Sequence, residues 1–383
     1  MTSPSMSGDL KIIPVSSQAE LERFIRVPMR LNARDPNYVA PLLFERREAL
    51  SPKHNPFFEH AEVQFWLAVR GGKDVGRISA QIDSLCREEP GKPTGQFGMI
   101  AAEDDPAVFQ ALFATAEAWL KARGKTHVMG PFNLSINEET GLLVAGFDTP
   151  PFFLMPHDQP YVGARVEELG YAKAKDLFAW YTGVPTFPKA VDKRLARPMG
   201  EGVVFRPVDK KHFERDIKAL VEIYNDAWAD NWQSVPITVS ETKYMKDSLG
   251  FILKDGLIWF MEIDGEPAAF GVMVPDLNWI ARDLGGKLFP FGWAKLLYRL
   301  KIGKIPRFRV PLMGVKRKFA KDPRGILAPF RIIRELRDQA VKYGMTNTEC
   351  GWVLEDNRPM NHIMENLQAV PYKTYRIYEK AIG

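Results

Sequence analysis

The sequence predicts an α/β protein with mixed (α+β) sheets, in which one structural plan occurs twice along the chain. Three observations support this prediction. The chain has 383 residues, more than a single hydrophobic core usually organises. The same order of hairpin, helix and strand is readable in both halves. A proline-rich stretch at 185–200 lies between the halves, as expected of a linker. We therefore predict domains at residues 1–184 and 201–383.

Each half contains two strands joined by a glycine-containing turn. They lie at Phe65–Asp83 in the first half and at Ile258–Asn278 in the second. A helix follows each hairpin. In the first half Asp105 is the expected N-cap and Pro106 the first helical residue, and the counterpart in the second half is 326–343. Each helix leads into a strand, and each half ends in a tyrosine-containing strand. Two unrelated α/β domains that match by chance are the alternative.

The composition excludes several protein classes. Hydrophobic residues make up 45% and charged residues 26% of the chain, as in ordinary globular proteins. No run approaches the roughly 18 apolar residues of a membrane-spanning helix, and the N-terminal residues do not form a secretory signal. Cys86 and Cys350 are too few for a disulfide scaffold and have no metal-binding spacing with the histidines. We expect a cytoplasmic protein without a bound metal.

The positive charge is concentrated in one segment. Residues 282–324 contain thirteen Lys and Arg against two Asp, a local charge of +11 in a chain whose net charge is +5, so the remainder carries −6. A local excess of this kind points to an anionic partner.

The residues that carry a family resemblance lie mainly in the second half. Arg309–Phe330 and Cys350–Leu367 resemble the GNAT superfamily of acyl-CoA N-acyltransferases. Together with Gly130–Pro151, Tyr224–Trp232 and Lys373–Lys380, they resemble a two-domain bacterial subfamily associated with ceramide synthesis, the N-acylation of a sphingoid base. The resemblance covers nearly the whole chain. It implies tandem GNAT-like domains, with acyl-CoA as the cosubstrate.

The resemblance implies that the C-terminal domain holds the CoA. A diphosphate binds well to backbone N–H groups at a helix N-terminus with cations nearby. The residues that the resemblance assigns to CoA are Met313, Val315, Lys316, Lys318, Arg324, Gly325 and Asn357. The chain departs from the family pattern at two positions. Asp322 stands where the family usually has a basic residue or Gln, and Leu327 stands where it usually has a small residue. A solvated basic loop is the alternative.

The equivalent turn of the N-terminal domain, Gly98–Phe109, is acidic and lacks the glycines of a phosphate-binding loop. Carboxylates repel phosphates, so we expect that this domain does not bind CoA.

Amide formation from a thioester requires a neutral amine, a base and polarisation of the carbonyl. In the superfamily a backbone N–H polarises the carbonyl, here between Met313 and Val315. The tyrosine that often protonates the thiolate is replaced by Met364. Candidate catalytic residues are Glu355, the preferred base, with His362 and Tyr378. A plain helix cap at Asp356-Asn357 and a half-buried strand tyrosine at 378 are the alternatives.

Two polar segments are candidates for binding the acceptor. The first contains Asn133, Asn137 and Glu139, for which a simple turn is an equally good interpretation. The second contains Asn225, Trp228, Asn231 and Trp232.

An insertion at 281–306 indicates the kind of substrate. Trp293, Leu296, Leu297 and Leu300 have helical spacing on one face, and Lys295 and Arg299 flank them. Helices of this type lie in membrane interfaces, so we predict peripheral contact with the cytoplasmic membrane face. An ordinary helix packed on the domain is the alternative.

The sequence therefore predicts an N-acyltransferase that acts on a hydrophobic amine. The competing hypotheses are a catalytically silent lipid-binding protein and a nucleic-acid-binding regulator. No nucleic-acid-binding motif is present, so no nucleic acid partner is expected.

Overall fold

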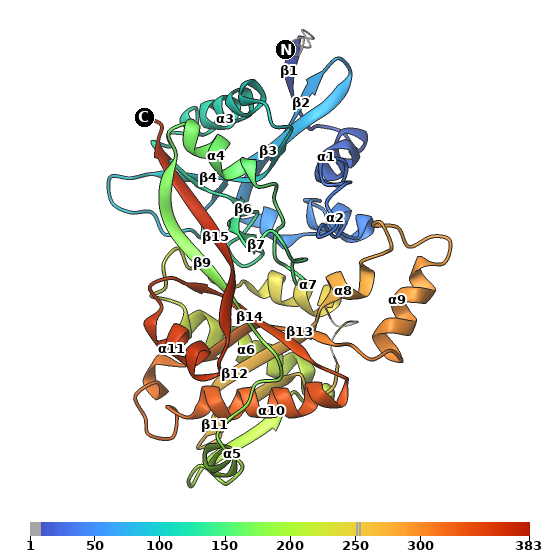
Figure 1. Cartoon of the computed structure of the whole chain (residues 1–383). Coiled ribbons are helices and arrows are strands. Elements are labelled where there is room, and N and C mark those ends of the chain that lie inside the picture. The colour runs from blue at the N-terminus through green and yellow to red at the C-terminus, as the bar shows by residue number, and fades with distance from the viewer. Residues whose placement is uncertain (1–8, 250–251, 253) are drawn as a thin grey trace. The chain divides into compact units, whose positions relative to one another are not determined.

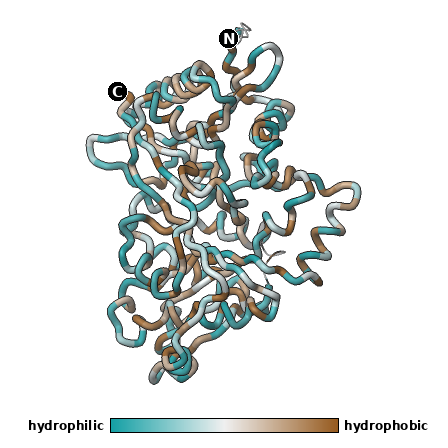
Figure 2. The backbone as a smooth tube through the Cα atoms, viewed as in Figure 1, coloured by the Kyte–Doolittle hydropathy of each residue, from teal (hydrophilic) through white to brown (hydrophobic). Residues whose placement is uncertain are grey.

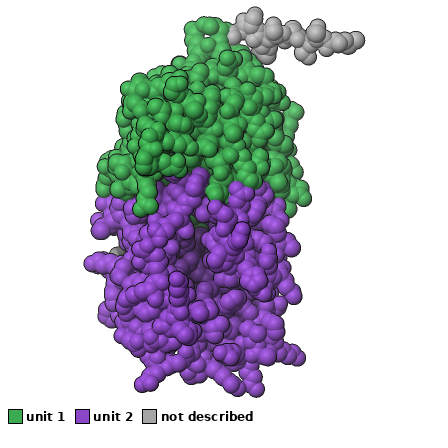
Figure 3. Space-filling model, turned by 90° about the vertical axis from the view of Figure 1, so that its left-hand side faces the viewer, with its two compact units in different colours: residues 1–176, 375–383 green, residues 177–374 purple. Residues whose placement is uncertain are grey.

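The computed structural model describes residues 9–249, 252 and 254–383 (Figure 1). Hydrophobic residues concentrate in the strands and on the inner sides of the helices (Figure 2). The chain divides into two compact units (Figure 3). Unit 1 comprises the residues up to 176 together with 375–383, and unit 2 comprises 177–374.

Unit 1 is a twisted sheet with helices on both faces. Its elements are β1 (Leu10–Pro14), α1 (Gln18–Leu31), α2 (Leu43–Ala49), the 3₁₀ turn η1 (Pro56–Glu59), β2 (Ala61–Arg70), β3 (Lys73–Asp83), β4 (Thr94–Ala102), α3 (Pro106–Lys121), β5 (His127–Gly130), β6 (Phe132–Asn133), β7 (Glu139–Thr140), β8 (Leu142–Ala145), α4 (Tyr161–Glu168) and the start of β9 (Ala172–Thr182).

The sheet of unit 1 runs β1-β2-β3-β4-β5 and continues with the end of the last strand of the chain, β15 (Val370–Ala381). Neighbouring strands are antiparallel except for β4 and β5, which are parallel. One hydrophobic core lies under α3 and a second lies on the α1 side.

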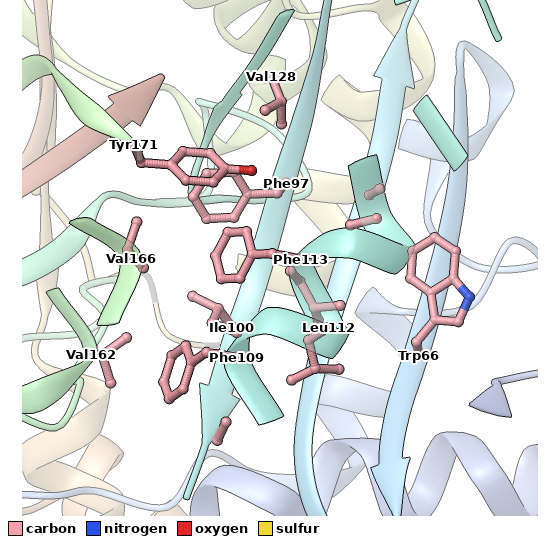
Figure 4. Close-up of a cluster of buried hydrophobic side chains, with 14 of the residues drawn as sticks. Trp66, Phe97, Ile100, Phe109, Leu112, Phe113, Val128, Val162, Val166 and Tyr171 are labelled. Carbon is pink, nitrogen blue, oxygen red and sulfur yellow. The ribbon is translucent and has the colours of Figure 1, made fainter. Parts of the chain in front are cut away.

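Helix α3 begins where the sequence predicts. The Asp105 side chain accepts a hydrogen bond from the Ala107 amide at 2.9 Å, and Pro106 occupies the first turn. Its apolar side chains Phe109, Leu112 and Phe113 are fully buried, and Figure 4 shows them packed with Phe97 of β4. The amphipathic spacing of the helix therefore creates the main core of the unit.

Unit 2 repeats this architecture. Its elements are α5 (Lys189–Leu195), β10 (Val203–Pro207), the 3₁₀ turn η2 (Lys210–His212), α6 (Phe213–Ala227), α7 (Val239–Leu249), β11 (Ile258–Ile263), β12 (Glu266–Pro275), α8 (Leu277–Ala281), α9 (Gly292–Lys301), β13 (Arg307–Val315), the 3₁₀ turn η3 (Arg317–Phe319), α10 (Ala328–Lys342), β14 (Asn347–Leu354), α11 (Arg358–Asn366) and the start of β15.

The sheet of unit 2 runs β10-β11-β12-β13-β14 and continues with the end of β9. Only β13 and β14 are parallel. Helices α6 and α10 cover opposite faces. A Cβ added to Gly271 would lie 2.4 Å from Ile332 of α10, whereas one added to Gly314 would lie 3.1 Å from Trp228, the residue after α6. The predicted α/β fold with two related domains is thus present.

The two halves of the sequence exchange their last strands. Leu177–Thr182 of β9 pairs with β14 in unit 2, and Tyr378–Ala381 of β15 pairs with β5 in unit 1. The units therefore do not coincide with a division at 185–200. That segment lies in unit 2, where it forms α5 and its Asp192 pairs with Arg334 and Arg337 of α10.

Candidate active site

The central feature of unit 2 is the separation of its two parallel strands. β13 and β14 pair from Arg307 and Asn347 as far as Val310 and Cys350. Beyond that point β13 carries one extra residue relative to β12, so the strand bulges. A bulge bends a strand and increases its twist. The last residues of β13 are therefore paired with β12 on one edge and have left β14 on the other.

The register fixes which backbone groups face this opening. Lys316 donates its amide hydrogen to the Ala268 carbonyl at 2.8 Å. In an antiparallel pair, residues alternate between those bonded to the neighbouring strand and those pointing away. Leu312 and Gly314 therefore face β12, and the N–H groups of Met313 and Val315 point to the edge that β14 has left. These are the two residues that the sequence analysis selected for carbonyl polarisation.

The loop after β13 is rich in cations, but most of them are paired within the unit. Their partners are Glu222 and Glu266 for Lys316, Glu266 for Lys318, Asp226 and Asp230 for Arg317, and Asp264 and Asp322 for Arg324. Among the described residues Lys321 has no ion-pair partner. The exposed basic excess suggested by the sequence is thus largely neutralised by acidic residues from other elements.

Asp322, one of the two departures from the family pattern, organises this loop. Its carboxylate accepts the Arg324 amide hydrogen at 2.8 Å and pairs with the Arg324 guanidinium at 3.0 Å. The hydrogen bonds from Arg324 lower the pKa of Asp322. Gly325 is required here, because an added Cβ would lie 2.0 Å from the Phe319 carbonyl oxygen.

Helix α10 starts without a side-chain cap. Its N-cap position is held by Leu327, whose side chain accepts no hydrogen bond. The N-terminal amides of this 15-residue helix carry a partial positive charge, so an anion is favoured there. Asn357, which the resemblance assigns to CoA, caps α11 by accepting the Met360 amide hydrogen at 3.2 Å.

In unit 1 the equivalent opening is filled by the chain itself. β4 and β5 pair only as far as Gln96 and Met129. A Cβ added to Gly98 would lie 1.9 Å from the Phe132 carbonyl oxygen, so the two backbones touch. The Met99 amide donates to Asn133 Oδ1 at 2.7 Å. Asp105 caps the following helix with a carboxylate, where unit 2 has Leu327.

Comparison with known proteins adds the family. The chain is 54% identical over 380 residues to the bacterial ceramide synthase of Caulobacter vibrioides, covering 99% of both chains. The chain belongs to the bacterial ceramide synthase family. It is also 46% identical to protein YghO of Escherichia coli K12, over 95% of this chain and 93% of that protein. No family model matches.

The fold of this acyltransferase is that of tandem GNAT proteins. A tandem GNAT protein from the clavulanic acid biosynthesis pathway aligns with a TM-score of 0.58 at 13% identity, over 98% of this chain and 99% of that one. A GCN5-related N-acetyltransferase from Sphaerobacter thermophilus aligns with a TM-score of 0.54 at 13% identity, over 100% and 97%. The predicted tandem GNAT fold and acyltransferase class are confirmed.

The acceptor candidates of unit 2 have different surroundings. Trp228 stacks on Tyr224 with ring centroids 4.4 Å apart and lies over Gly314, beside the opening. Asn225 is occupied in bonding both backbone groups of Ile237. Asn231 and Trp232 are both partly buried, and both lie in the segment that Asn225 holds.

The three catalytic candidates belong to different units, Glu355 and His362 to unit 2 and Tyr378 to unit 1. Glu355 is partly buried at the end of β14, and its carbonyl oxygen accepts from the Asn361 side chain. His362 is largely exposed on α11, 3.5 Å from Glu365. Tyr378 belongs to unit 1, where it is buried and donates to Glu167 at 3.0 Å. Burial and this hydrogen bond raise the pKa of Tyr378.

The polar turn of unit 1 is largely bonded to its own unit. Asn133 also donates to Glu139 at 3.1 Å, and Glu139 lies 3.5 Å from Arg46. The Asn137 amide donates to Ser135 Oγ at 3.1 Å. The interpretation as a structured turn therefore describes much of this segment.

To the polar turn, which contains Glu138, the structure adds Asp158 and Arg77, two ionisable residues that the sequence analysis did not select. Burial raises the pKa of Glu138 to about 8 and that of Asp158 to about 7, and burial lowers the pKa of Arg77 to about 10. One signal was available in the sequence. Residues 77, 79, 81 and 83 of β3 are polar and alternate with apolar residues, although the sheet face they share is buried.

The insertion forms α9, but its apolar residues do not share one environment. Leu296 and Leu300 pack on the unit, whereas Trp293 and Leu297 are 48% and 45% exposed. Lys295 and Arg299 pair with Asp283. The four residues thus form one stripe with unequal burial, because the helix turns only part of the stripe toward the unit. Within the residues described, no helix is both long and apolar enough to span a bilayer.

Proposed function

We propose that unit 2 binds an acyl-CoA and that this enzyme transfers the acyl group to the amine of a long-chain sphingoid base. The observation that carries the proposal is the opening between β13 and β14, with the N–H groups of Met313 and Val315 directed into it. The substrate class follows from the relative named bacterial ceramide synthase. Because Phe132–Asn133 occupies the same opening in unit 1, unit 1 is proposed not to bind CoA.

The opening suits the chemistry of amide formation. The neutral amine attacks the thioester carbonyl, a C–N bond forms, the C–S bond breaks and the amine loses one proton. An N–H from Met313 or Val315 stabilises the negative charge that develops on the carbonyl oxygen. A thiol with an ordinary pKa near 8.5 leaves without an obligatory acid. Glu355, at the end of β14, stays the preferred base, and a base of this kind contributes about 10²–10⁴-fold.

The CoA diphosphate is assigned to the start of α10 and the loop before it. The uncapped helix N-terminus favours an anion, and Lys321 and Arg324 add charge. The diphosphate would compete with Asp264 and Asp322 for the Arg324 guanidinium.

The test is thiol release from acyl-CoAs of several chain lengths, with and without a sphingoid base. We expect release that depends on the base. Arg324→Ala should raise KM for acyl-CoA about tenfold or more, since a hydrogen bond to a charged group contributes about 1.5–3 kcal/mol. Lys342→Ala, at the other end of α10, is the matched control and should leave KM unchanged.

Two outcomes would overturn the proposal. Absence of release with every thioester, from a folded protein that still binds lipid vesicles, would leave a silent lipid-binding scaffold. Tight, steeply salt-dependent DNA or RNA binding without release would favour the regulatory hypothesis.

Contact with a membrane is the second part of the proposal. It rests on a group of exposed apolar side chains around α9, here called the α9 patch: Phe289, Phe291, Trp293, Leu297, Tyr298 and Ile302. Phe289 and Phe291 are 84% and 78% exposed. Three exposed lysines in the same segment, at 287, 301 and 304, form no ion pair with any described residue. Aromatic residues flanked by unpaired cations match the interface of an anionic bilayer.

Vesicle flotation tests this part. Phosphatidylglycerol vesicles should bind the protein more strongly than phosphatidylcholine vesicles, and Phe289→Ser with Phe291→Ser should weaken binding without changing thiol release from soluble substrates. Val204→Ser, an exposed valine on β10, is the control. Unchanged vesicle binding in the double variant would contradict the proposal that the α9 patch contacts a membrane. So would a wild-type dimer that the double variant abolishes, because the patch would then bind a second copy of the chain.

A further inference from the structure

Unit 1 contains a buried polar face that its own fold does not satisfy. Arg77, Ser79 and Gln81 share the α1-facing side of β3, opposite the α3 core. Ser79 and Gln81 are fully buried. Arg77 Nε, Ser79 Oγ and Gln81 Oε1 make no hydrogen bond with any described residue. Buried polar atoms are normally hydrogen-bonded, so three orphans in one row indicate bound molecules.

This row lies under the turn that fills the opening of unit 1. Gln81 Nε2 donates to the Phe132 carbonyl at 3.0 Å and also to the Leu134 carbonyl. Asn133, between them, connects to Glu139. The orphan atoms and the turn are thus parts of one polar region.

Carboxylates gather at the same place. Glu139 and Asp158 both act electrostatically on Arg77, and Glu138 and Glu139 both act on Arg46. The Asp158 side chain accepts the Leu143 amide hydrogen at 2.9 Å. Glu45 is the carboxylate that forms the shorter pair with Arg46. Two arginines therefore face four carboxylates, an excess of two negative charges when all are ionised, and a bound monovalent cation would balance one of them.

We propose that Glu138, Glu139 and Asp158 bind the ammonium group of an amino alcohol, and that Arg77 binds its neighbouring oxygen. This inference rests on the proposed function, since it assigns the polar end of the sphingoid base to unit 1. The raised pKa values of Glu138 and Asp158 agree with it, because burial without a compensating cation favours the neutral acid. A bound ammonium would favour the charged form of a carboxylate beside it.

The polar groups fit an amino alcohol better than a simple amine. An ammonium has three donors and no acceptor, so it suits carboxylates alone. Arg77 Nε and Gln81 offer a donor and an acceptor to hydroxyl groups. A vicinal amino alcohol presents both kinds of group within a few ångströms.

Calorimetric titration with 2-aminooctane-1,3-diol, a short water-soluble probe, tests the site. Glu138→Gln and Asp158→Asn, which conserve shape, should each raise its Kd at least tenfold and leave acyl-CoA affinity unchanged. Glu117→Gln, a carboxamide on α3 across the same sheet, is the control, since Glu117 pairs with Lys380 and Tyr171 instead. The N-acetylated probe, which has lost the charge, should not bind the wild-type protein.

Equal affinities of all folded variants, or equal binding of the acetylated probe, would overturn the inference. The two proposals fail separately. Thiol release that stays normal in Glu138→Gln and Asp158→Asn removes the amino-alcohol site and leaves the acyltransferase. Probe binding that depends on these residues without any thiol release keeps the site and removes the proposed reaction.

Discussion

In unit 1 the parallel strands β4 and β5 stop pairing after Gln96 and Met129, and in unit 2 the strands β13 and β14 stop after Val310 and Cys350. Two parallel strands therefore separate at a corresponding point in both units. In unit 1 the chain returns through the gap at Phe132 and bonds the amide that would otherwise face it. In unit 2 the corresponding amides of β13 keep their free edge. The difference shows that one copy of the repeated fold fills the gap with its own backbone, whereas the other leaves the edge of its strand unpaired with the neighbouring parallel strand.

The helices α3 and α10, which follow β4 and β13, differ at their N-termini. α3 begins at Asp105, whose carboxylate caps the helix and pairs with Arg70. α10 begins at Leu327 without a side-chain cap. A carboxylate occupies in unit 1 the position at which unit 2 is proposed to receive phosphate.

The largest expected effect is on the free energy of unfolding, and it compares a glycine beside the gap of each unit. Gly98→Ala places a Cβ 1.9 Å from a backbone oxygen, which cannot move without shifting the turn at Phe132. Gly314→Ala meets only side-chain atoms, of which Trp228 is nearest at 3.1 Å. We expect Gly98→Ala to lower the free energy of unfolding by about 3 kcal/mol, and Gly314→Ala to lower it by less than about 1 kcal/mol.

Urea unfolding of both variants checks this prediction. Gly72→Ala is the reference, because Gly72 lies in an open turn where an added Cβ meets no atom but the positive φ still disfavours alanine. Similar losses at Gly98 and Gly314 would mean that the gap of unit 1 is no more tightly filled than that of unit 2.

The second prediction transfers the cap of unit 1 to unit 2. Leu327→Asp places a carboxylate at the start of α10, where it should repel the CoA diphosphate and raise KM for acyl-CoA about tenfold, equivalent to about 1.4 kcal/mol. The helix itself should gain about 0.3–1 kcal/mol from the charge. Steady-state kinetics with thermal unfolding measures both effects. Leu327→Asn is the uncharged control, and equal KM values for the two variants would argue against phosphate at this helix end.

The sequence was sufficient to predict helices and strands, but not which strands pair with one another. Asp105-Pro106 determines where α3 begins, because capping is a local interaction. The strand exchange could not be predicted, since β9 and β15 are similar tyrosine-containing strands and only tertiary contacts decide which sheet each completes. The alternation of apolar and polar residues in these two segments predicts that they are strands, but it does not indicate which strands lie next to them.

The site shows the same limit. The resemblance proposes the glycine at 325 and the amides at 313 and 315, because it assigns them by their positions along one strand and the turn that follows it. The pairing of Lys316 with Glu222, 94 positions away, and the electrostatic interaction of Glu139 with Asp158 join residues distant in the sequence and leave no local trace. The alternating polar residues of β3 were visible, but a strand with one polar face usually turns that face to water.

The smallest expected effect is a pH dependence of opposite sign in the two units. In unit 1 burial raises the pKa of Glu138 to about 8, so its stabilising contribution is present at low pH and is lost as the pH rises from about 5 to 8. In unit 2 burial alone would raise the pKa of Asp216, but hydrogen bonds from Arg206 and the Asp209 amide lower it. The contribution of Asp216 is therefore present above its ordinary range and is lost as the pH falls.

Glu138→Gln isolates the contribution of unit 1, because the amide is neutral at every pH. Between pH 5 and 8 the wild-type free energy of unfolding should fall by on the order of 1 kcal/mol more than that of the variant. Urea unfolding at several pH values measures the two curves. Asp216→Asn should leave the slope above pH 5 unchanged and weaken the protein by about 1–2 kcal/mol at neutral pH, because Arg206 loses its buried charged partner and keeps only Glu262. Parallel curves for the wild type and Glu138→Gln would show that the Glu138 carboxyl is already charged in the folded protein, and the excess of negative charge in unit 1 would then need a bound cation even in the absence of substrate.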